Sequence, residues 1–478
     1  MSFTKKLILG SFVWKLLEKC SVQLITFIVT IILARILLPE EYGVVAILTI
    51  FINLANVIID GGLNTALIQK KDSDDLDFST IFFSSSLISI IIYFLLYLLA
   101  PFIAYFYQDE TLVSLTRVLS ITVIPCAINA VQKAYISKFM LFKKMFYCSL
   151  ISILISGVIS IYYAYNGVGA WALVIQILVN QFSITVIMFF MIGWKPKLIF
   201  SWERFAILFD YGWKIFVTNF IIALYEDIRG LLIGKYYKPE ILAYFDRGKQ
   251  FPSLIMGNIN SSIQTVLFPA FSDSQDDRDK VKAMMRKSTQ ISCFFVLPLL
   301  MGVAASSHSI VLMLLGTKWL PCVPYVIIFS FALMLMPIQS SNMLAIKSLG
   351  YSNIILKLEM IKKIVEAIIL IVSFQFDVYV VAWGIFFYNF ICIFINLYPN
   401  KKLLNYSIPE QLKDVFLYYS NSLIMGLFVY WVGLLHLNSV VLFFMQLISG
   451  VAIYYILCKF TKVDTLSYVM NTILKSKK

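Results

Sequence analysis

The sequence has little charge for its length. Asp, Glu, Lys and Arg make up 14% of its 478 residues, whereas 60% of the residues are hydrophobic. Histidine occurs twice, and the seven cysteines are scattered without a CxxC pair. The motifs GxxxxGKS, GxxxxGKT, HExxH and GxSxG are absent. These absences argue against an ordinary soluble protein, a nucleotide-binding domain, and a disulfide or metal framework.

Long apolar runs occur from one end of the chain to the other. A run of roughly 18 or more apolar residues is long enough to cross a bilayer as a helix. We therefore predict an all-α, polytopic membrane protein with about fourteen transmembrane helices. The helices are expected near residues 10–37, 43–69, 78–106, 112–132, 145–165, 168–193, 205–234, 241–269, 287–315, 322–346, 354–375, 377–398, 416–436 and 438–460.

Basic residues alternate in abundance between successive connections. The formal charge of +13 is concentrated at the N-terminus, at the C-terminal tail and in every second loop, as in Lys70–Lys71, in Lys133, Lys138, Lys143 and Lys144, and in Lys195, Lys197 and Arg204. This alternation is typical of membrane orientation rather than of nucleic-acid binding. It predicts that both termini are cytoplasmic and that no nucleic acid is a partner.

A short internal repeat links the two halves of the chain. The segment Arg35–Glu40 resembles Lys235–Glu240 at an offset of 200 residues, and six predicted helices separate the two copies. An even number of intervening helices gives both copies the same orientation. Transporters are often built from such repeats, with the substrate site where the repeats meet.

The second predicted helix carries one polar stripe. Thr49, Asn53, Asn56, Asp60 and Asn64 fall on one side of it at 100° per residue. Weaker stripes occur in the first helix (Lys19, Gln23, Thr26, Thr30) and the eighth (Asn258, Ser261, Ser262, Thr265). Hydrogen bonding between helices explains any single residue equally well. Three such stripes together favour a shared polar cavity.

Charged residues also interrupt the apolar runs at the start of the second half. They are Glu226, Asp227, Arg229, Asp246 and Arg247, on the outer half of the predicted seventh and eighth helices. A charge in the centre of a bilayer costs about 2.5–3.5 kcal/mol by insertion scales. One interpretation is structural: Glu226 and Arg229, three residues apart, neutralise each other along one helix face. The other is a functional site, since guanidinium groups suit bidentate binding of phosphate.

Two stretches resemble a known family. They are ARILLPEEYG (34–43) with GGLNTALIQKKD (61–72), and the central run from DIRGLLIGKYYKPEILAYFDRGKQFP to TVLFPAFSDSQDD (227–277). In this order they are similar to oligosaccharide flippases, the Wzx-type members of the multidrug/oligosaccharidyl-lipid/polysaccharide exporter superfamily. Phe245 and Arg229 depart from the residues that are common in that family.

The resemblance implies a fold similar to that of multidrug exporters. One six-helix lobe would comprise 1–200 and a pseudo-symmetric second lobe 201–400, with a helix pair and basic tail in 401–478. The implied location is the bacterial cytoplasmic membrane. The implied substrate is a polyprenyl-diphosphate-linked oligosaccharide, moved to the outer leaflet for surface polysaccharide synthesis, with membrane lipids and polysaccharide polymerase or assembly proteins as partners.

The resemblance and the residues together suggest roles within the path. Arg229 and Arg247 are expected to contact the diphosphate, and Asn53, Asn56, Asp60 and Asn64 to line the path of the sugar. No resident cofactor or metal is expected. The driving force stays open, with Glu226, Asp227 and Asp246, or Asp60, as candidates for H⁺ or Na⁺ coupling or for gating.

Two other classes of protein compete with this reading. A drug or cation antiporter has the same fold, although the extra helix pair and the motifs count against it. A membrane glycan polymerase or ligase is an enzyme that usually presents a long outer loop with catalytic residues. No predicted loop here exceeds about twenty residues, so we expect a transporter rather than an enzyme.

Overall fold

The computed structural model describes residues 5–70, 72–274 and 276–467. Within these ranges the chain is helical, without strands, which confirms the predicted all-α class. The chain divides into two compact units, 1–243 and 244–478. The division at 200 and 400, which the family resemblance implies, stays a prediction.

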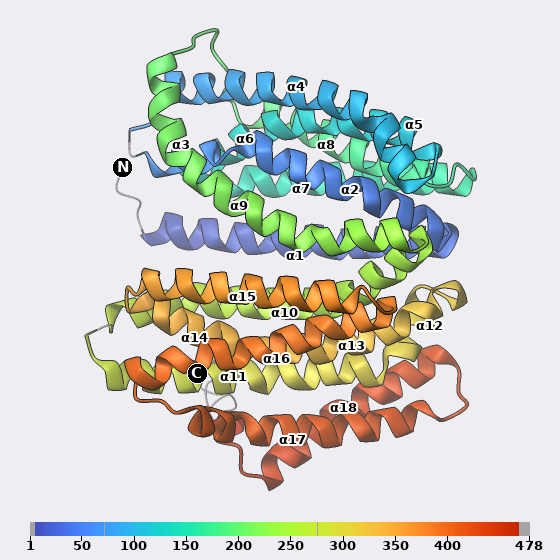
Figure 1. Cartoon of the computed structure of the whole chain (residues 1–478), viewed down its shortest axis with the longest axis vertical. Coiled ribbons are helices and arrows are strands. Elements are labelled where there is room, and N and C mark those ends of the chain that lie inside the picture. Colours follow the sequence, from blue (N-terminus) through green and yellow to red (C-terminus); the bar gives the residue numbers. More distant parts are fainter. Residues whose placement is uncertain (1–4, 71, 275, 468–478) are drawn as a thin grey trace. The chain divides into compact units, whose positions relative to one another are not determined.

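The first unit contains nine α-helices and one 3₁₀ helix in its described part, and the tenth α-helix begins there (Figure 1). They are α1 (Lys5–Ile36), α2 (Pro39–Asp60), α3 (Leu63–Gln69), α4 (Asp75–Tyr107), α5 (Thr111–Leu119), η1 (Ser120–Thr122), α6 (Val123–Lys138), α7 (Phe142–Tyr165), α8 (Trp171–Met191) and α9 (Trp202–Tyr236). The short α3 and the start of α9 lie at one end of these helices, and the α4–α5 turn lies at the other (Figure 1).

The second unit contains the remaining helices. They are α10 (Pro239–Asp273), which crosses the boundary, α11 (Arg278–Ala305), α12 (Ser307–Leu314), η2 (Thr317–Cys322), α13 (Val323–Met334), α14 (Met336–Ser348), α15 (Ser352–Ser373), α16 (Val378–Leu403), α17 (Ile408–Gly433) and α18 (Ser439–Phe460).

Twelve helical segments among the described residues are long and apolar enough to cross a membrane. The two predicted spans that fail this criterion are α10 and α15. Both are charged: α10 carries Asp246, Arg247 and Lys249, and α15 carries Lys362 and Glu366 among others. The count of fourteen transmembrane helices therefore stays a prediction.

Several predicted spans are broken where continuous helices were expected. The expected helix 43–69 divides into α2 and α3 at Gly61 and Gly62, whose φ angles of +50° and +68° are left-handed. Only glycine adopts this conformation readily, so the pair ends one helix and redirects the chain into the next. Expected helices 112–132 and 322–346 are likewise divided, by η1 and at Leu335.

The internal repeat coincides with equivalent helix ends. Helix α1 ends at Ile36 and α2 begins at Pro39, while α9 ends at Tyr236 and α10 begins at Pro239. Proline at the first helical position suits a helix start because its missing N–H would have no partner there. The offset of 200 residues therefore holds for the structure of the junction as well as for its sequence.

Glycines bring α2 and α9 unusually close along their length. A Cβ on Gly62 would lie 2.2 Å from the carbonyl oxygen of Gly212 in α9. Near the other end of α9, a Cβ on Gly234 would lie 2.8 Å from Cγ1 of Ile47 in α2. Tyr107 in α4 also donates to the carbonyl oxygen of Leu231, at 3.2 Å. Helix α9 is thus packed against the helices of the first unit at both of its ends.

Buried amides join three helices of the second unit. Asn342 in α14 donates to Gln411 in α17 at 2.9 Å, and Asn400 in α16 donates to Asn342 at 2.6 Å. Gln339 donates to the carbonyl oxygen of Asn389 at 2.9 Å. Amide side chains commonly hold membrane helices together in this way. In this network the polar residues hold helices together, which was the alternative to a polar cavity in the sequence analysis.

Candidate functional site: a polar cavity in the first unit

A cavity of about 440 Å³ opens between α2, α3, α6 and α8. Its size falls within the range of roughly 300–1,000 Å³ that is usual for small-molecule sites. Its lining residues are Asn56, Ile59, Asp60, Asn64, Thr65, Ile68, Cys126, Asn129, Ala130, Lys133, Ala134, Ser137 and Gln181. The walls therefore combine a carboxylate, an ammonium group, amides and hydroxyls within helices that are otherwise apolar.

Three members of the predicted stripe line this cavity. Asn56 and Asp60 come from the last turns of α2, and Asn64 comes from α3. The Gly61–Gly62 turn keeps Asn64 beside Asp60. The Nδ2 atom of Asn64 donates to the Asp60 carboxylate at 2.5 Å. Asn53 is exposed and is not among the lining residues, so the stripe continues beyond the cavity. The roles of all four stay predictions.

Two amides in the cavity wall were not singled out from the sequence. Asn129 in α6 donates to Gln181 Oε1 in α8 at 3.3 Å, and accepts from Thr185 at 2.9 Å. These bonds tie α6 to α8. By contrast, the Oδ1 atoms of Asn56 and Asn64 are buried without a hydrogen-bond partner among the described residues. Buried acceptors of this kind are costly to leave unpaired.

Lys133 is the residue that sequence reasoning placed wrongly. It was grouped with Lys138, Lys143 and Lys144 as a loop charge, but α6 continues to Lys138 and includes it. Lys133 is exposed and lines the cavity. It lies on one face of α6 with Asn129 and Ser137, at intervals of about one turn. Cys126, Asn129, Lys133 and Ser137 follow one another at helical intervals of three or four residues. This spacing could have placed Lys133 on the helix from the sequence alone.

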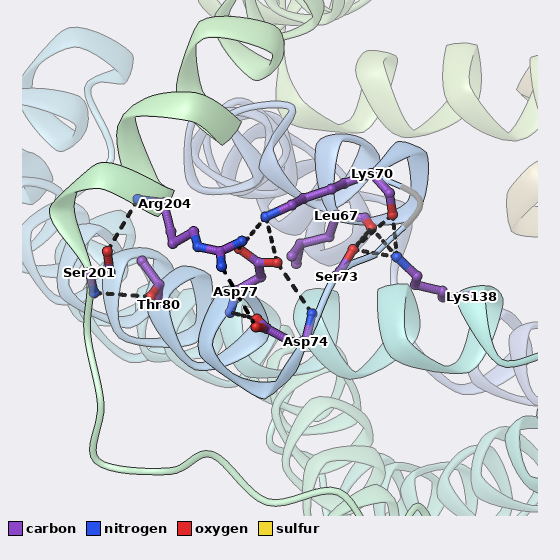
Figure 2. Close-up of polar contacts among 9 residues, drawn as sticks. All are labelled: Leu67, Lys70, Ser73, Asp74, Asp77, Thr80, Lys138, Ser201 and Arg204. Carbon is purple, nitrogen blue, oxygen red and sulfur yellow. Dashed lines mark hydrogen bonds and ion pairs between the residues drawn. The ribbon is translucent and has the colours of Figure 1, made fainter.

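A network of charged residues holds the short helix α3 in place (Figure 2). Lys138, at the end of α6, donates to the carbonyl oxygens of Leu67 and Lys70 and to the Ser73 hydroxyl. These carbonyls lie at the C-terminus of α3, where a helix has unpaired acceptors and a partial negative charge. The same helix α6 thus supplies Lys133 to the cavity and Lys138 to the helix that forms its wall.

Asp77 is the centre of the second part of this network. Its carboxylate is fully buried and accepts from Lys70 Nζ through both oxygens, each at 2.7 Å. Arg204 lies in the first turn of α9, and its Nη1 atom is 3.5 Å from Asp77 Oδ1 (Figure 2). The paired cations offset the cost of burying this charge. We define the clamp as Lys70, Asp77, Lys138 and Arg204.

The connection between α8 and α9 is tied to the same place. The backbone N–H of Lys197 donates to Ser79 at 3.0 Å, and that of Ser201 donates to Thr80 at 3.2 Å. Ser201 in turn caps α9 by accepting from the N–H of Arg204 at 3.3 Å. Leu67 of α3 belongs to one buried apolar cluster with Phe78 of α4 and Trp194. The cavity wall therefore rests on a well-packed base.

Asp74 caps α4 beside the clamp, and its ionisation gives a pH-dependent prediction. The Asp77 N–H donates to its carboxylate at 3.0 Å. This bond, with the charge of Arg204, lowers the pKa of Asp74 below its ordinary value of 3.8. The ionised form therefore stabilises the folded protein fully above pH 3.8, and this contribution is lost as the pH falls through the lower folded-state pKa.

We expect Asp74→Ala to cost about 1 kcal/mol of unfolding free energy at neutral pH, as for other helix caps. Stability would be measured by thermal unfolding in detergent between pH 7 and pH 3. The difference from the wild type should shrink only in the most acidic samples. Asp74→Asn keeps the capping acceptor and should stay near the wild type; a difference that already disappears near pH 5 would contradict the assignment.

The charged residues predicted in the seventh and eighth helices fall in different units. Glu226, Asp227 and Arg229 lie in α9 of the first unit, with Glu226 exposed and the other two partly exposed. Asp246 and Arg247 lie in α10 of the second unit. The Arg247 guanidinium lies 5.7 Å from the centre of the Trp319 ring. That Arg229 and Arg247 share a ligand stays a prediction, as does ion coupling by the three acids.

The polar face proposed for the eighth helix is described in part. Ser261 and Ser262 both donate to the carbonyl oxygen of Asn258, at 3.1 Å and 2.8 Å. These are bonds within the helix rather than between helices. The side chain of Thr265 lies outside the described residues.

Comparison with known proteins places this architecture in a family. The chain is 24% identical over 348 residues to the teichuronic acid biosynthesis protein TuaB of Bacillus subtilis, covering 71% of each protein. It is 25% identical over 310 residues to the succinoglycan biosynthesis transport protein ExoT of Rhizobium meliloti, covering 64% of this chain and 62% of that protein.

The fold is shared with a solved structure. The lipid II flippase MurJ, in an inward closed conformation, aligns with a TM-score of 0.74 and 17% identity, over 97% of this chain and 100% of that one. A sequence profile described as polysaccharide biosynthesis protein matches residues 32–324, which include the cavity and the clamp. The chain belongs to the polysaccharide biosynthesis protein family.

Proposed function

We propose that this protein is a flippase for polyprenyl-diphosphate-linked oligosaccharide repeat units. It would move them from the cytoplasmic to the outer leaflet of the bacterial cytoplasmic membrane, for assembly of a surface polysaccharide. Both termini would be cytoplasmic, as the basic loops predict. The observation that carries the proposal is the polar cavity lined by Asp60, Asn64, Asn129 and Lys133 within apolar helices.

The physical problem that such a substrate presents matches this cavity. Diphosphate and sugar hydroxyl groups cannot cross hydrocarbon unaided, because burying unpaired charges and polar groups is costly. Amide and carboxylate groups replace the hydrogen bonds that sugar hydroxyls lose from water, while the polyprenyl chain stays in the lipid.

Family membership and the names of the relatives support the same function. TuaB and ExoT are named for polysaccharide biosynthesis, and ExoT for transport. MurJ, which shares the fold, is named as a lipid flippase. Arg229 and Arg247 remain our candidates for diphosphate contacts at a later stage of transport, and Glu226, Asp227 and Asp246 for coupling to H⁺ or Na⁺ or for gating.

A deletion strain tests this proposal. Loss of the gene should abolish the surface polysaccharide and leave lipid-linked repeat units accessible only from the cytoplasmic leaflet. A plasmid copy should restore both. Normal surface polysaccharide in the deletion strain, or repeat units that reach the outer leaflet without the protein, would contradict the function. Restored dye efflux without any polysaccharide phenotype would instead indicate a drug antiporter.

A further inference from the structure

We propose that Lys133 is the cation that captures the diphosphate of the incoming lipid, with Asp60 and Asn64 oriented to receive the first sugar. This inference rests on the proposed function and deepens it. It places a loading site in the first unit, separate from Arg229 and Arg247.

Lys133 has no hydrogen-bonding or ion-pair partner in the described part of the chain. It makes no hydrogen bond and no ion pair among the residues that the structure describes, although it lies within a segment long and apolar enough to span a membrane. A lysine in such a position normally pairs with an acid, faces water or binds a ligand. An ammonium group that lines a cavity is therefore available to an anion.

The neighbouring acids are already engaged. Glu18 in α1 contributes to the electrostatic environment of Lys133. However, one oxygen of Glu18 accepts from Lys15 at 2.8 Å and the other from Ser149 at 3.2 Å. Asp60 accepts from Asn64 at 2.5 Å and makes no ion pair with Lys133. Neither carboxylate neutralises the lysine in this structure.

The two charges of the cavity lie on different helices and favour one orientation of the ligand. Lys133 is on α6, whereas Asp60 is on α2. A phosphate is attracted to the lysine and repelled by the carboxylate. Asp60 is instead an acceptor for sugar hydroxyls. The diphosphate would thus lie against α6 and the sugar against α2 and α3.

The position of the cavity fits loading rather than release. It lies at the ends of α2 and α6 that lead to Lys70 and Lys138. The basic-loop pattern predicts that this end is cytoplasmic, and a lipid synthesised in the cytoplasmic leaflet presents its headgroup there. A volume of about 440 Å³ suits a headgroup with one sugar rather than a whole repeat unit.

The direct test is binding of farnesyl diphosphate to the purified full-length protein in detergent, by calorimetry, with farnesol as the uncharged probe. We expect Lys133→Gln to weaken farnesyl diphosphate binding by about tenfold or more, because a charge-assisted contact is lost. Lys133→Arg should bind within about threefold of the wild type, since it keeps the charge. Farnesol binding should be the same for all three proteins. Lys143→Gln removes an exposed charge outside the cavity and is the matched control.

Asp60→Asn provides a second test of the same site. Asp60→Asn should strengthen farnesyl diphosphate binding severalfold by removing the repulsion, and this arm serves if Lys133→Gln does not fold. Unchanged binding in folded Lys133→Gln, or weaker binding in Asp60→Asn, would overturn the assignment. Complementation in cells distinguishes a wrong loading site from a wrong function. If the protein is essential for polysaccharide export but Lys133→Gln complements fully, the loading site is wrong and the function stands.

Discussion

Asp77→Ala is expected to lower the free energy of unfolding by about 3 kcal/mol. Asp77 is fully buried, so its removal leaves Lys70 and Arg204 without the carboxylate that they share. The value lies at the lower end for broken buried pairs because 22% of the Lys70 side chain remains exposed. The effect would be measured as a loss of resistance to unfolding in mixed detergent micelles, together with the amount of protein in the membrane.

The neighbouring acid provides a control for this effect. Asp75 pairs with Lys197 at 2.6 Å, but both side chains are about half exposed, at 47% and 63%. Exposed pairs contribute less than about 1 kcal/mol, so Asp75→Asn should be nearly neutral. The double variant Lys70→Met with Asp77→Leu removes the buried carboxylate together with Lys70 and should recover part of the loss. Arg204 keeps Asp74 at 3.9 Å as a remaining partner. Equal effects of Asp77→Ala and Asp75→Asn would contradict a buried clamp.

Gly62→Ala is expected to destabilise the protein by about 2–5 kcal/mol, for two reasons that act together. At a φ of +68° any side chain is strained, at a cost of roughly 1–2 kcal/mol. The added Cβ would also lie 2.2 Å from the carbonyl oxygen of Gly212, which belongs to a helix backbone and cannot turn aside. Overpacking of this kind costs about 1–3 kcal/mol more.

The adjacent glycine separates these two contributions. Gly61 also has a positive φ, of +50°, but the nearest atom to its added Cβ is 3.6 Å away. Gly61→Ala should therefore show only the cost of the left-handed backbone. We expect Gly62→Ala to unfold at least about 1 kcal/mol more easily than Gly61→Ala in the same assay. If the two variants were equal, α9 would not be packed against the Gly61–Gly62 turn as described.

The fold was largely predictable because long apolar runs constrain a chain strongly. Such runs predicted the helices, and the Pro39 and Pro239 repeats predicted two equivalent junctions. The breaks within spans were not predicted. The Gly61–Gly62 turn lies inside an apolar stretch, and hydrophobicity does not distinguish a helix from two helices joined by a glycine turn.

The site was predictable only where a polar residue stood out locally. Asp60 and the asparagines near it form a stripe on one helix, which is visible without tertiary structure. The place of Lys133 in the cavity was not predicted, because the positive-inside rule already explained it as a basic loop residue. The clamp joins Asp77 to Arg204, and the sequence does not show that residues so far apart are in contact. A single acid near the start of a helix, such as Asp77, is usually interpreted as part of a helix cap.

Translocation by the purified protein tests directly whether it transports a lipid-linked oligosaccharide. Proteoliposomes would contain a polyprenyl-diphosphate-linked repeat unit isolated from the deletion strain, and its arrival in the opposite leaflet would be followed with a membrane-impermeant glycan label. We predict that the wild type moves the lipid faster than empty liposomes do, and that Lys133→Gln moves it more slowly than Lys143→Gln does. If the folded wild type and empty liposomes gave the same rate, the protein would not be a flippase for this lipid.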